Sequence, residues 1–167
     1  MRQTWDETWL EVAVVVARRS LCVRAQVGCV VVNAHNRIAA TGYNGPPSGF
    51  RMPRILTDDE TSGQFTDCKV WCPRADKGPT SKTVSTYDDC PSLHAELNAL
   101  SVCDRTAREG GTIYITGHPC FACTKMIANS GLSCVVVKSA SADYRMPERS
   151  YAFLKDCGLA VILVDDV

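Results

Sequence analysis

The sequence has no excess of charge of either sign. Its 18 lysine and arginine residues are matched by 18 aspartate and glutamate residues, so the formal net charge is zero. A protein that binds a nucleic-acid backbone needs a basic surface, because contacts to phosphates dominate that kind of binding. The balanced composition therefore argues against nucleic acid, including tRNA, as a partner.

Long apolar runs are missing as well. Every stretch of consecutive apolar residues is far shorter than the roughly 20 residues that a membrane-spanning helix needs. Residues 1–7 are polar and acidic, unlike the basic and then apolar order of a secretory signal. We therefore expect a cytoplasmic protein that has no membrane partner.

Histidine is scarce, with three residues, whereas cysteine is plentiful, with ten. In a secreted chain this many cysteines would indicate disulfides. In a reducing compartment, thiols instead serve as metal ligands or as small buried hydrophobic residues. Four of the cysteines lie in segments that we expect to form strands or helices, and we assign them to the core: Cys29, Cys103, Cys134 and Cys157.

The 167 residues suit one domain of ordinary size. Thr4 and Glu7 have the spacing of a capping box, ahead of an apolar helix that we expect to run to about Ser20. Two strands follow as a hairpin, with His35 in its exposed turn. A stretch rich in Gly, Pro, Asp, Thr and Ser comes next, at about 44–92, and helices then alternate with strands. The expected strands are 27–32, 37–43, 112–116, 134–137 and 160–164, and the later helices are 94–105, 121–130 and 147–157.

Two hairpin strands followed by alternating helices and strands predict one α/β domain over residues 1–167. We expect a three-layer α/β/α fold around a mixed five-stranded sheet. The stretch at about 44–92 is then a loop insertion in that domain.

Two short motifs indicate the chemistry. His94 is followed by Ala95 and Glu96, and a Pro-Cys-x-x-Cys segment lies further along at 119–123. A catalytic zinc site has three protein ligands and an open position for water, whose pKa falls to about 7. His94, Cys120 and Cys123 supply three ligands of the right kind. Glu96 supplies a carboxylate that can accept and deliver protons.

Both motifs are expected at the start of a helix. Cys120 and Cys123 are three residues apart and share one helix face, and Pro119 is tolerated where that helix begins. The positive ends of two helix dipoles would favour thiolates there. A Cys-x-x-Cys pair by itself is more often a structural zinc site or a redox pair. The accompanying His94 and Glu96 favour the catalytic interpretation, and we expect His118 to be a loop residue near the site rather than a ligand.

These motifs resemble those of the deoxycytidylate (dCMP) deaminases, in the zinc-dependent cytidine-deaminase-like superfamily. Residues 26–31 are similar to the family's first strand, residues 42–49 to its G-Y-N-G-x-P-x-G loop, and residues 94–99 to its H-A-E-x-N-A motif. The chain departs from the family's usual Thr-Leu-x-Pro-Cys by carrying Gly117 in place of the leucine, with His118 at the variable position. That departure leaves the ligands in place and changes the wall of the pocket.

The resemblance implies a zinc-dependent hydrolase that converts dCMP to dUMP and ammonia, and so supplies dUMP for thymidylate synthesis. Water attacks C4 of the base, and Glu96 moves protons to N3 and to the departing amine. The backbone N–H of Ala95 and the side chain of Asn44 would hold the base and sugar, although Asn44 also suits a turn before Gly45. Tyr144 would contact the 5′-phosphate, with help from Arg145, or would instead pack on the final helix.

The resemblance also implies a homo-oligomer, a hexamer, with dCTP and dTTP as effectors. Some phage members hold a second zinc in the insertion, which suggests a structural zinc site formed by Cys22, Cys68, Cys72 and Cys90. The alternative is that these four are ordinary reduced thiols.

Two rival functions remain open at this point. One is another deaminase of the same superfamily, acting on a nucleoside, a modified dCMP or a tRNA base. The other is a non-catalytic zinc-binding module, which leaves Glu96 without a role.

Overall fold

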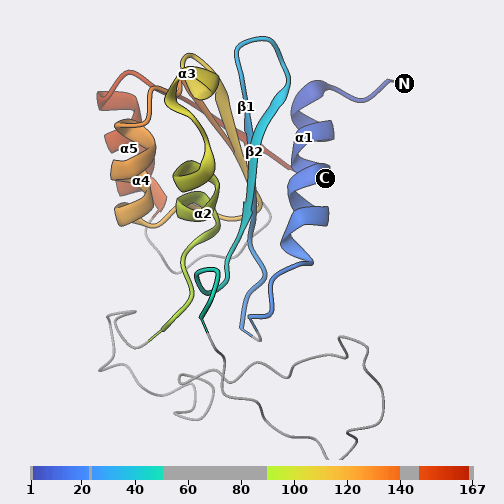
Figure 1. Ribbon diagram of the computed structural model, residues 1–167. Helices are drawn as coiled ribbons and strands as arrows, with labels where there is room; N and C mark the ends of the chain where they lie inside the picture. Colours follow the sequence, from blue (N-terminus) through green and yellow to red (C-terminus); the bar gives the residue numbers. More distant parts are fainter. Residues whose placement is uncertain (1, 23, 51–89, 140–146, 166–167) are drawn as a thin grey trace, which may run out of the picture.

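One mixed sheet of five strands, in the order β2-β1-β3-β4-β5, runs through the molecule (Figure 1). The computed structural model describes residues 2–22, 24–50, 90–139 and 147–165. β1 (Gly28–Val32) is antiparallel to β2 (Ile38–Tyr43) and to β3 (Thr112–Ile115). β3, β4 (Cys134–Lys138) and β5 (Ala160–Val164) are parallel. The predicted mixed sheet is therefore confirmed.

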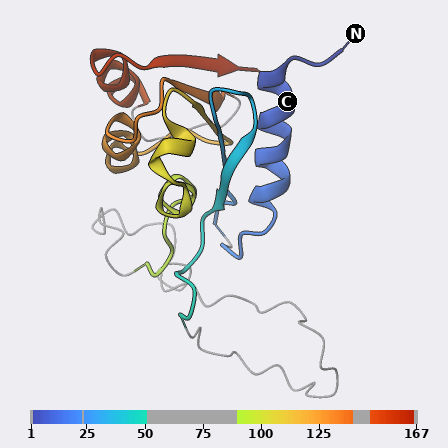
Figure 2. The same ribbon diagram turned by 45° about the horizontal axis from the view of Figure 1, so that its top comes forward.

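Helices cover both faces of this sheet. α1 (Trp5–Ala17) lies on one face, and α2 (Ala95–Val102), α4 (Phe121–Ala128) and α5 (Pro147–Asp156) lie on the other (Figures 1 and 2). Alternate residues of the central strands point to opposite faces. Val30 and Val136 accordingly pack with Leu10 of α1, whereas Val31 and Val135 pack with Ala99 and Ile127 of α2 and α4. This arrangement gives the three layers that the element order predicts.

Local signals explain where α1 begins and ends. The backbone N–H of Glu7 donates to Thr4 Oγ1 at 3.2 Å, and Glu7 Oε2 accepts from the backbone N–H of Thr4 at 2.7 Å, which confirms the capping box. The helix ends at Ala17, slightly before the expected Ser20. Ser20 lies outside the helix, where its hydroxyl donates to the carbonyl of Asn44 at 2.7 Å.

The helix expected over 94–105 is interrupted. α2 ends at Val102, and a separate short helix, α3 (Arg105–Arg108), follows. Between them Cys103 has an extended backbone, with φ −91° and ψ 121°. The guanidinium of Arg108 donates to the carbonyls of Leu100 and Cys103, at 2.8 and 2.5 Å. It thereby satisfies carbonyls that a helix end leaves without partners, so α2 can stop there.

The cysteines assigned to the core divide into two groups. Cys29 and Cys103 are buried, as expected, and Cys134 is half-buried. The assignment of Cys157 was wrong, because this residue is exposed. It lies just past the end of α5, before Gly158, whose φ of 85° reverses the chain direction into β5.

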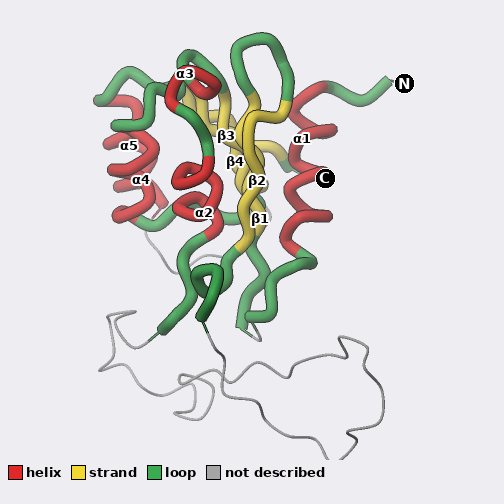
Figure 3. The backbone as a smooth tube through the Cα atoms, viewed as in Figure 1, coloured by secondary structure: helices red, strands yellow, loops and turns green. Residues whose placement is uncertain are grey.

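One edge of the sheet gathers the starts of two helices. β2 and β3 are each antiparallel to the β1 strand between them, so their carboxyl ends lie at the same edge. α2 begins near that edge, and α4, the next element after β3, begins there as well (Figure 3). In α/β sheets ligands usually bind outside the carboxyl ends of the strands. The fold therefore brings both sequence motifs to the edge where a site is expected.

The close approach of α1 to β1 leads to a prediction about stability. A methyl group at Gly28 would lie 1.9 Å from the Ala13 carbonyl oxygen and 2.7 Å from the Ala17 nitrogen. We expect Gly28→Ala to lower the free energy of unfolding by about 1–3 kcal/mol, because the helix must shift to make room. Urea unfolding of the purified variants measures this. Gly117→Ala is the control, since nothing lies within 4 Å of its added methyl. Equal stability of the two variants would contradict the packing of α1 on β1.

Candidate metal centre and active site

His94, Cys120 and Cys123 come together at the edge of the sheet where α2 and α4 begin. The Nδ1 atom of His94 lies 3.4 Å from the Sγ atom of Cys120 and 3.4 Å from that of Cys123. The three ligand atoms all lie within 4.8 Å of one another. Within the described part of the chain, this is the group of His, Cys, Asp or Glu side chains that is close enough to bind one metal ion.

Both helices use a residue of this cluster as their N-cap. His94 caps α2 with φ −72° and ψ 155°, and Cys120 caps α4 with φ −67° and ψ 161°. The Cys120 thiol accepts the backbone N–H of Cys123 at 3.5 Å, as the side chain of an N-cap usually does. The site therefore lies between the positive ends of two helix dipoles, which favour negative charge on the thiols.

Further contacts hold His94 in place. Leu93, the preceding residue, forms an isolated antiparallel bridge with Gly45, in which each N–H donates to the other residue's carbonyl with nitrogen-to-oxygen distances of 2.9 and 3.1 Å. This bridge ties the start of α2 to the loop that leaves β2. The loop and the segment that leads into His94 are thus parts of one hydrogen-bonded unit.

The three donors fit zinc. Tetrahedral zinc takes sulfur at about 2.3 Å and nitrogen at about 2.0–2.1 Å, which places a sulfur and a nitrogen ligand roughly 3.6 Å apart. The separations of 3.4 Å from His94 to each cysteine agree with that geometry. Three protein donors also leave a fourth tetrahedral position for water or substrate, as in catalytic zinc sites.

The charge balance of the thiols also calls for a cation. A hydrogen bond from Cys123 lowers the pKa of Cys120 to about 3, with His94 contributing in the same direction and burial opposing. The same bond between the two thiols, then burial and the Glu96 carboxylate, raise the pKa of Cys123. One thiolate therefore forms readily and a second does not. A divalent cation would release both protons, as thiolate ligation requires.

Glu96 lies beside this cluster in the first turn of α2 and is only 4% exposed. Its carboxylate is close enough to Cys123 to contribute to the raised pKa of that thiol, and it also helps raise the pKa of the fully buried Cys29 beneath, where burial is the main cause. Glu96 is not in the group of metal-binding side chains. A buried carboxylate next to the metal-binding group, and outside it, is suited to proton transfer.

Asn44 has a structural role that the sequence left open. Its Oδ1 accepts from the N–H of Val27 at 2.8 Å, and its Nδ2 donates to the carbonyl of Ala25 at 2.9 Å. The amide therefore fastens the loop after β2 to the segment before β1. Each of its two polar atoms can make one more hydrogen bond, so the contact of Asn44 with substrate stays a prediction.

Asn98 helps to position the site, and the sequence motif alone did not predict this role. It is one helical turn after His94, and its Nδ2 donates to the carbonyl of Tyr43 at 2.8 Å. It thereby anchors α2 to the end of β2. The signal in the sequence was the four-residue spacing from His94, which puts both side chains on one face of the helix.

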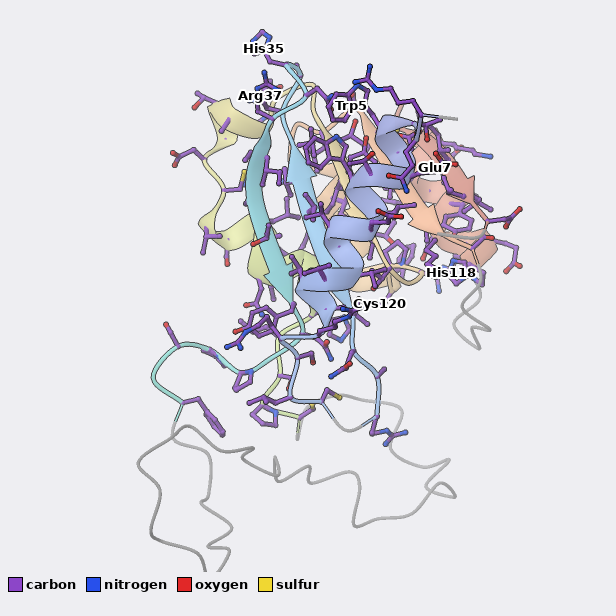
Figure 4. All side chains as sticks on the ribbon, turned by 90° about the vertical axis from the view of Figure 1, so that its right-hand side faces the viewer. Trp5, Glu7, His35, Arg37, His118 and Cys120 are labelled. Atoms are coloured by element: carbon purple, nitrogen blue, oxygen red, sulfur yellow. The ribbon has the colours of Figure 1, made fainter. Side chains whose placement is uncertain are left out.

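The other sequence predictions have mixed outcomes. Ala95 is buried in the first turn of α2, and its contact with substrate stays a prediction. His118 lies in the loop before α4 and is 8% exposed, whereas His35 is exposed at the far end of the molecule (Figure 4). Tyr144 and Arg145 lie outside the described residues. Of the four cysteines in the predicted second zinc site, Cys68 and Cys72 also lie outside, and Cys22 and Cys90 are half-buried. That site stays a prediction.

Within the described ranges, every helix is too short or too polar to span a lipid bilayer.

Comparison with known proteins agrees with this site. The family model described as the cytidine and deoxycytidylate deaminase zinc-binding region matches residues 3–139. The deoxycytidylate deaminase of Mycobacterium phage D29 is 40% identical over 144 residues, which cover 84% of this chain and 98% of the phage protein. The deoxycytidylate deaminase of Saccharomyces cerevisiae is 38% identical over 162 residues, which cover 96% of this chain and 45% of the yeast protein. The chain thus spans less than half the length of its yeast relative.

Solved structures agree with the fold. The crystal structure of dCMP deaminase from the cyanophage S-TIM5 in complex with dCMP and dUMP matches with a TM-score of 0.66 and 27% sequence identity. The match covers 98% of this chain and 99% of that one. Together with the family model over most of the sequence, these relatives show that the chain belongs to the family of zinc-binding cytidine and deoxycytidylate deaminases.

Proposed function

We propose that this protein is a zinc-dependent hydrolase that converts dCMP to dUMP and ammonia, supplying dUMP for thymidylate synthesis. The observation that carries the proposal is the buried carboxylate of Glu96 beside the group formed by His94, Cys120 and Cys123. Such a site combines metal donors with a separate acid–base group. A purely structural zinc site needs four ligands and no such carboxylate.

In this proposal His94, Cys120 and Cys123 hold one zinc ion. When bound, the zinc acts as a Lewis acid that makes water a nucleophile at neutral pH. Glu96 accepts one proton from the attacking water and delivers it to N3 of the cytosine ring, and it then takes the second proton of that water from the new hydroxyl at C4 and delivers it to the leaving amine. Burial of Glu96 excludes bulk water from this transfer, so the proton moves between the carboxylate and the substrate.

Substrate contacts come from the loop after β2 and the first turn of α2. Asn44 would contact the sugar, and the N–H of Ala95 would contact the base. The Leu93–Gly45 bridge holds these two segments side by side, so that both can border the same substrate. The choice of a deoxynucleotide monophosphate is supported by the phage relative, whose name is deoxycytidylate deaminase and which this chain covers almost completely. Tyr144, with Arg145, stays our prediction for the phosphate contact.

Oligomeric state and regulation follow from the family resemblance. We expect a homo-oligomer, a hexamer, with dCTP and dTTP as effectors of its activity. The second candidate function, deamination of a 5-modified dCMP, would use the same zinc donors and Glu96 and would differ in the wall of the pocket, where Gly117 replaces the usual leucine.

Replacing Glu96 tests the acid–base role. Glu96→Gln keeps the size of the side chain but cannot accept a proton. We expect it to bind zinc as the wild-type protein does and to lose turnover by about 10²–10⁴-fold. Metal analysis and the loss of cytosine absorbance measure the two quantities on the same sample. A variant with full zinc and near-wild-type turnover would remove Glu96 from the mechanism.

The ligand assignment predicts that zinc content and activity fall together. His94→Ala, Cys120→Ser and Cys123→Ser should each lower both, because each removes one of three protein ligands. Cys157→Ser is the matched control, since that thiol is exposed and far along the chain from the cluster. Undiminished zinc content in all three variants would show that the metal is bound by other residues.

Substrate preference gives a further prediction. A site that pairs with a phosphate leaves buried donors unsatisfied when the phosphate is absent, and this can cost several orders of magnitude in kcat/KM. We expect dCMP to be preferred over deoxycytidine, CMP and dCTP in a spectrophotometric panel run with and without dCTP and dTTP as effectors. Equal rates for deoxycytidine and dCMP would exclude the nucleotide assignment. A clear preference for 5-methyl-dCMP would favour the second candidate function.

A further inference from the structure

Two consecutive residues of α5 contact the two residues that precede Cys120. Ser150, which is 2% exposed, donates its hydroxyl to the carbonyl of Pro119 at 3.1 Å. Tyr151 makes a hydrogen bond through its hydroxyl to Nδ1 of His118. The rings of Tyr151 and His118 also meet edge to face, with centroids 5.7 Å apart. We call Ser150, Tyr151 and His118 the α5 clamp.

The clamp contacts the chain on the N-terminal side of Cys120, whereas α4 holds the C-terminal side. After Cys120, the N–H and the hydroxyl of Thr124 both donate to the Cys120 carbonyl at 2.9 Å, so the first turn of α4 fixes that side. Before Cys120, residues 116–119 have no helical or strand structure. The contacts from α5 therefore hold the segment through which β3 leads into the metal-binding residue.

α5 itself is firmly placed against α4. Phe153, one turn from Arg149 and Ser150, packs edge to face on Phe121 with ring centroids 5.3 Å apart. The guanidinium of Arg149 lies 4.0 Å from the centre of the Phe121 ring, and Leu154 is fully buried. A clamp on a packed helix can set a position to within fractions of an ångström, which a contact from a loose loop does not do.

We propose that Ser150 and Tyr151 are positioning residues of the metal centre. They hold the Pro119 carbonyl and the His118 ring so that the Cys120 thiolate meets the metal at the right place and angle. Whichever tautomer His118 adopts, one of the two groups in its bond to Tyr151 donates and the other accepts. The inference rests on the proposed function, because it takes Cys120 as a zinc ligand.

Two conservative variants test the clamp in the zinc-loaded protein. Ser150→Ala removes one hydroxyl, and Tyr151→Phe removes another but keeps the ring. Replacing a group that orients a metal ligand typically lowers metal affinity by about 10–100-fold. Because the clamp acts on Cys120 through the backbone, we expect each variant to lower zinc affinity by about tenfold, the lower end of that range. The rate of zinc transfer to a chromophoric chelator should rise accordingly. In cobalt-substituted protein the thiolate-to-cobalt absorption band should shift, and kcat should fall more than KM rises.

Two matched variants control for lost stability. Ser130 is also buried and donates its hydroxyl to a backbone carbonyl, that of Ile127 at 2.6 Å, but at the other end of α4. Tyr114, which is buried whereas Tyr151 is half-buried, donates its hydroxyl to Asp6 at 2.9 Å on the opposite face of the sheet. We expect Ser130→Ala and Tyr114→Phe to lower the melting temperature comparably and to leave the zinc-transfer rate and the cobalt spectrum unchanged.

The outcomes separate the two proposals. If Cys120→Ser keeps full zinc content and the wild-type cobalt spectrum, the ligand assignment fails, and the clamp with it. If Cys120→Ser loses zinc while Ser150→Ala and Tyr151→Phe release zinc at the wild-type rate with an unshifted cobalt band, the proposed function stands and the clamp is overturned. Equal acceleration by Ser130→Ala and Tyr114→Phe would also overturn it, because the effect would then be one of general stability.

Discussion

The site depends above all on how closely α2 packs against β2. At Gly42 an added methyl group would lie 2.3 Å from the Ala95 carbonyl and 2.5 Å from the Ala99 nitrogen, so the two backbones are nearly in contact. Asn98 fastens the same helix to the carbonyl of Tyr43 at 2.8 Å. Because α2 cannot slide on the sheet, the imidazole at its N-cap and the carboxylate in its first turn have one position relative to α4.

Negative charge is the second constraint on this site. Two thiols, one of them with a raised pKa, and a buried carboxylate meet within a few side chains of one another. Two helix N-termini offset part of this charge, and the hydrogen bond between the thiols keeps one proton. A divalent cation would neutralise the rest of the negative charge. Its binding explains why two thiols and a carboxylate, which are costly to bury as anions, are tolerated at the edge of an apolar core.

The sequence predicted most of the fold because its signals are local. The capping box at Thr4, the β-branched run of β1 and the proline before Cys120 each act within one turn or one strand, so the elements and their order could be read directly. Two boundaries were wrong for a reason outside the local pattern. The side chain of Arg108, which lies in α3, caps a carbonyl at the end of α2, so that helix stops early. The hydroxyl of Ser20 donates to the carbonyl of Asn44, so Ser20 lies outside α1. Both involve partners that are distant in sequence or lie in another element.

The sequence by itself determined the chemical identity of the donors and of the acid–base group, because residue type and close spacing decide which atoms one helix turn can present. Only the tertiary structure decided that the N-caps of two helices far apart in sequence meet, that the amide of Asn44 fastens the segment before β1, and that α5 contacts the residues before Cys120. Such contacts depend on strand order and on helices packing across the sheet. No short segment encodes them, because each joins parts of the chain that become neighbours only when the core forms.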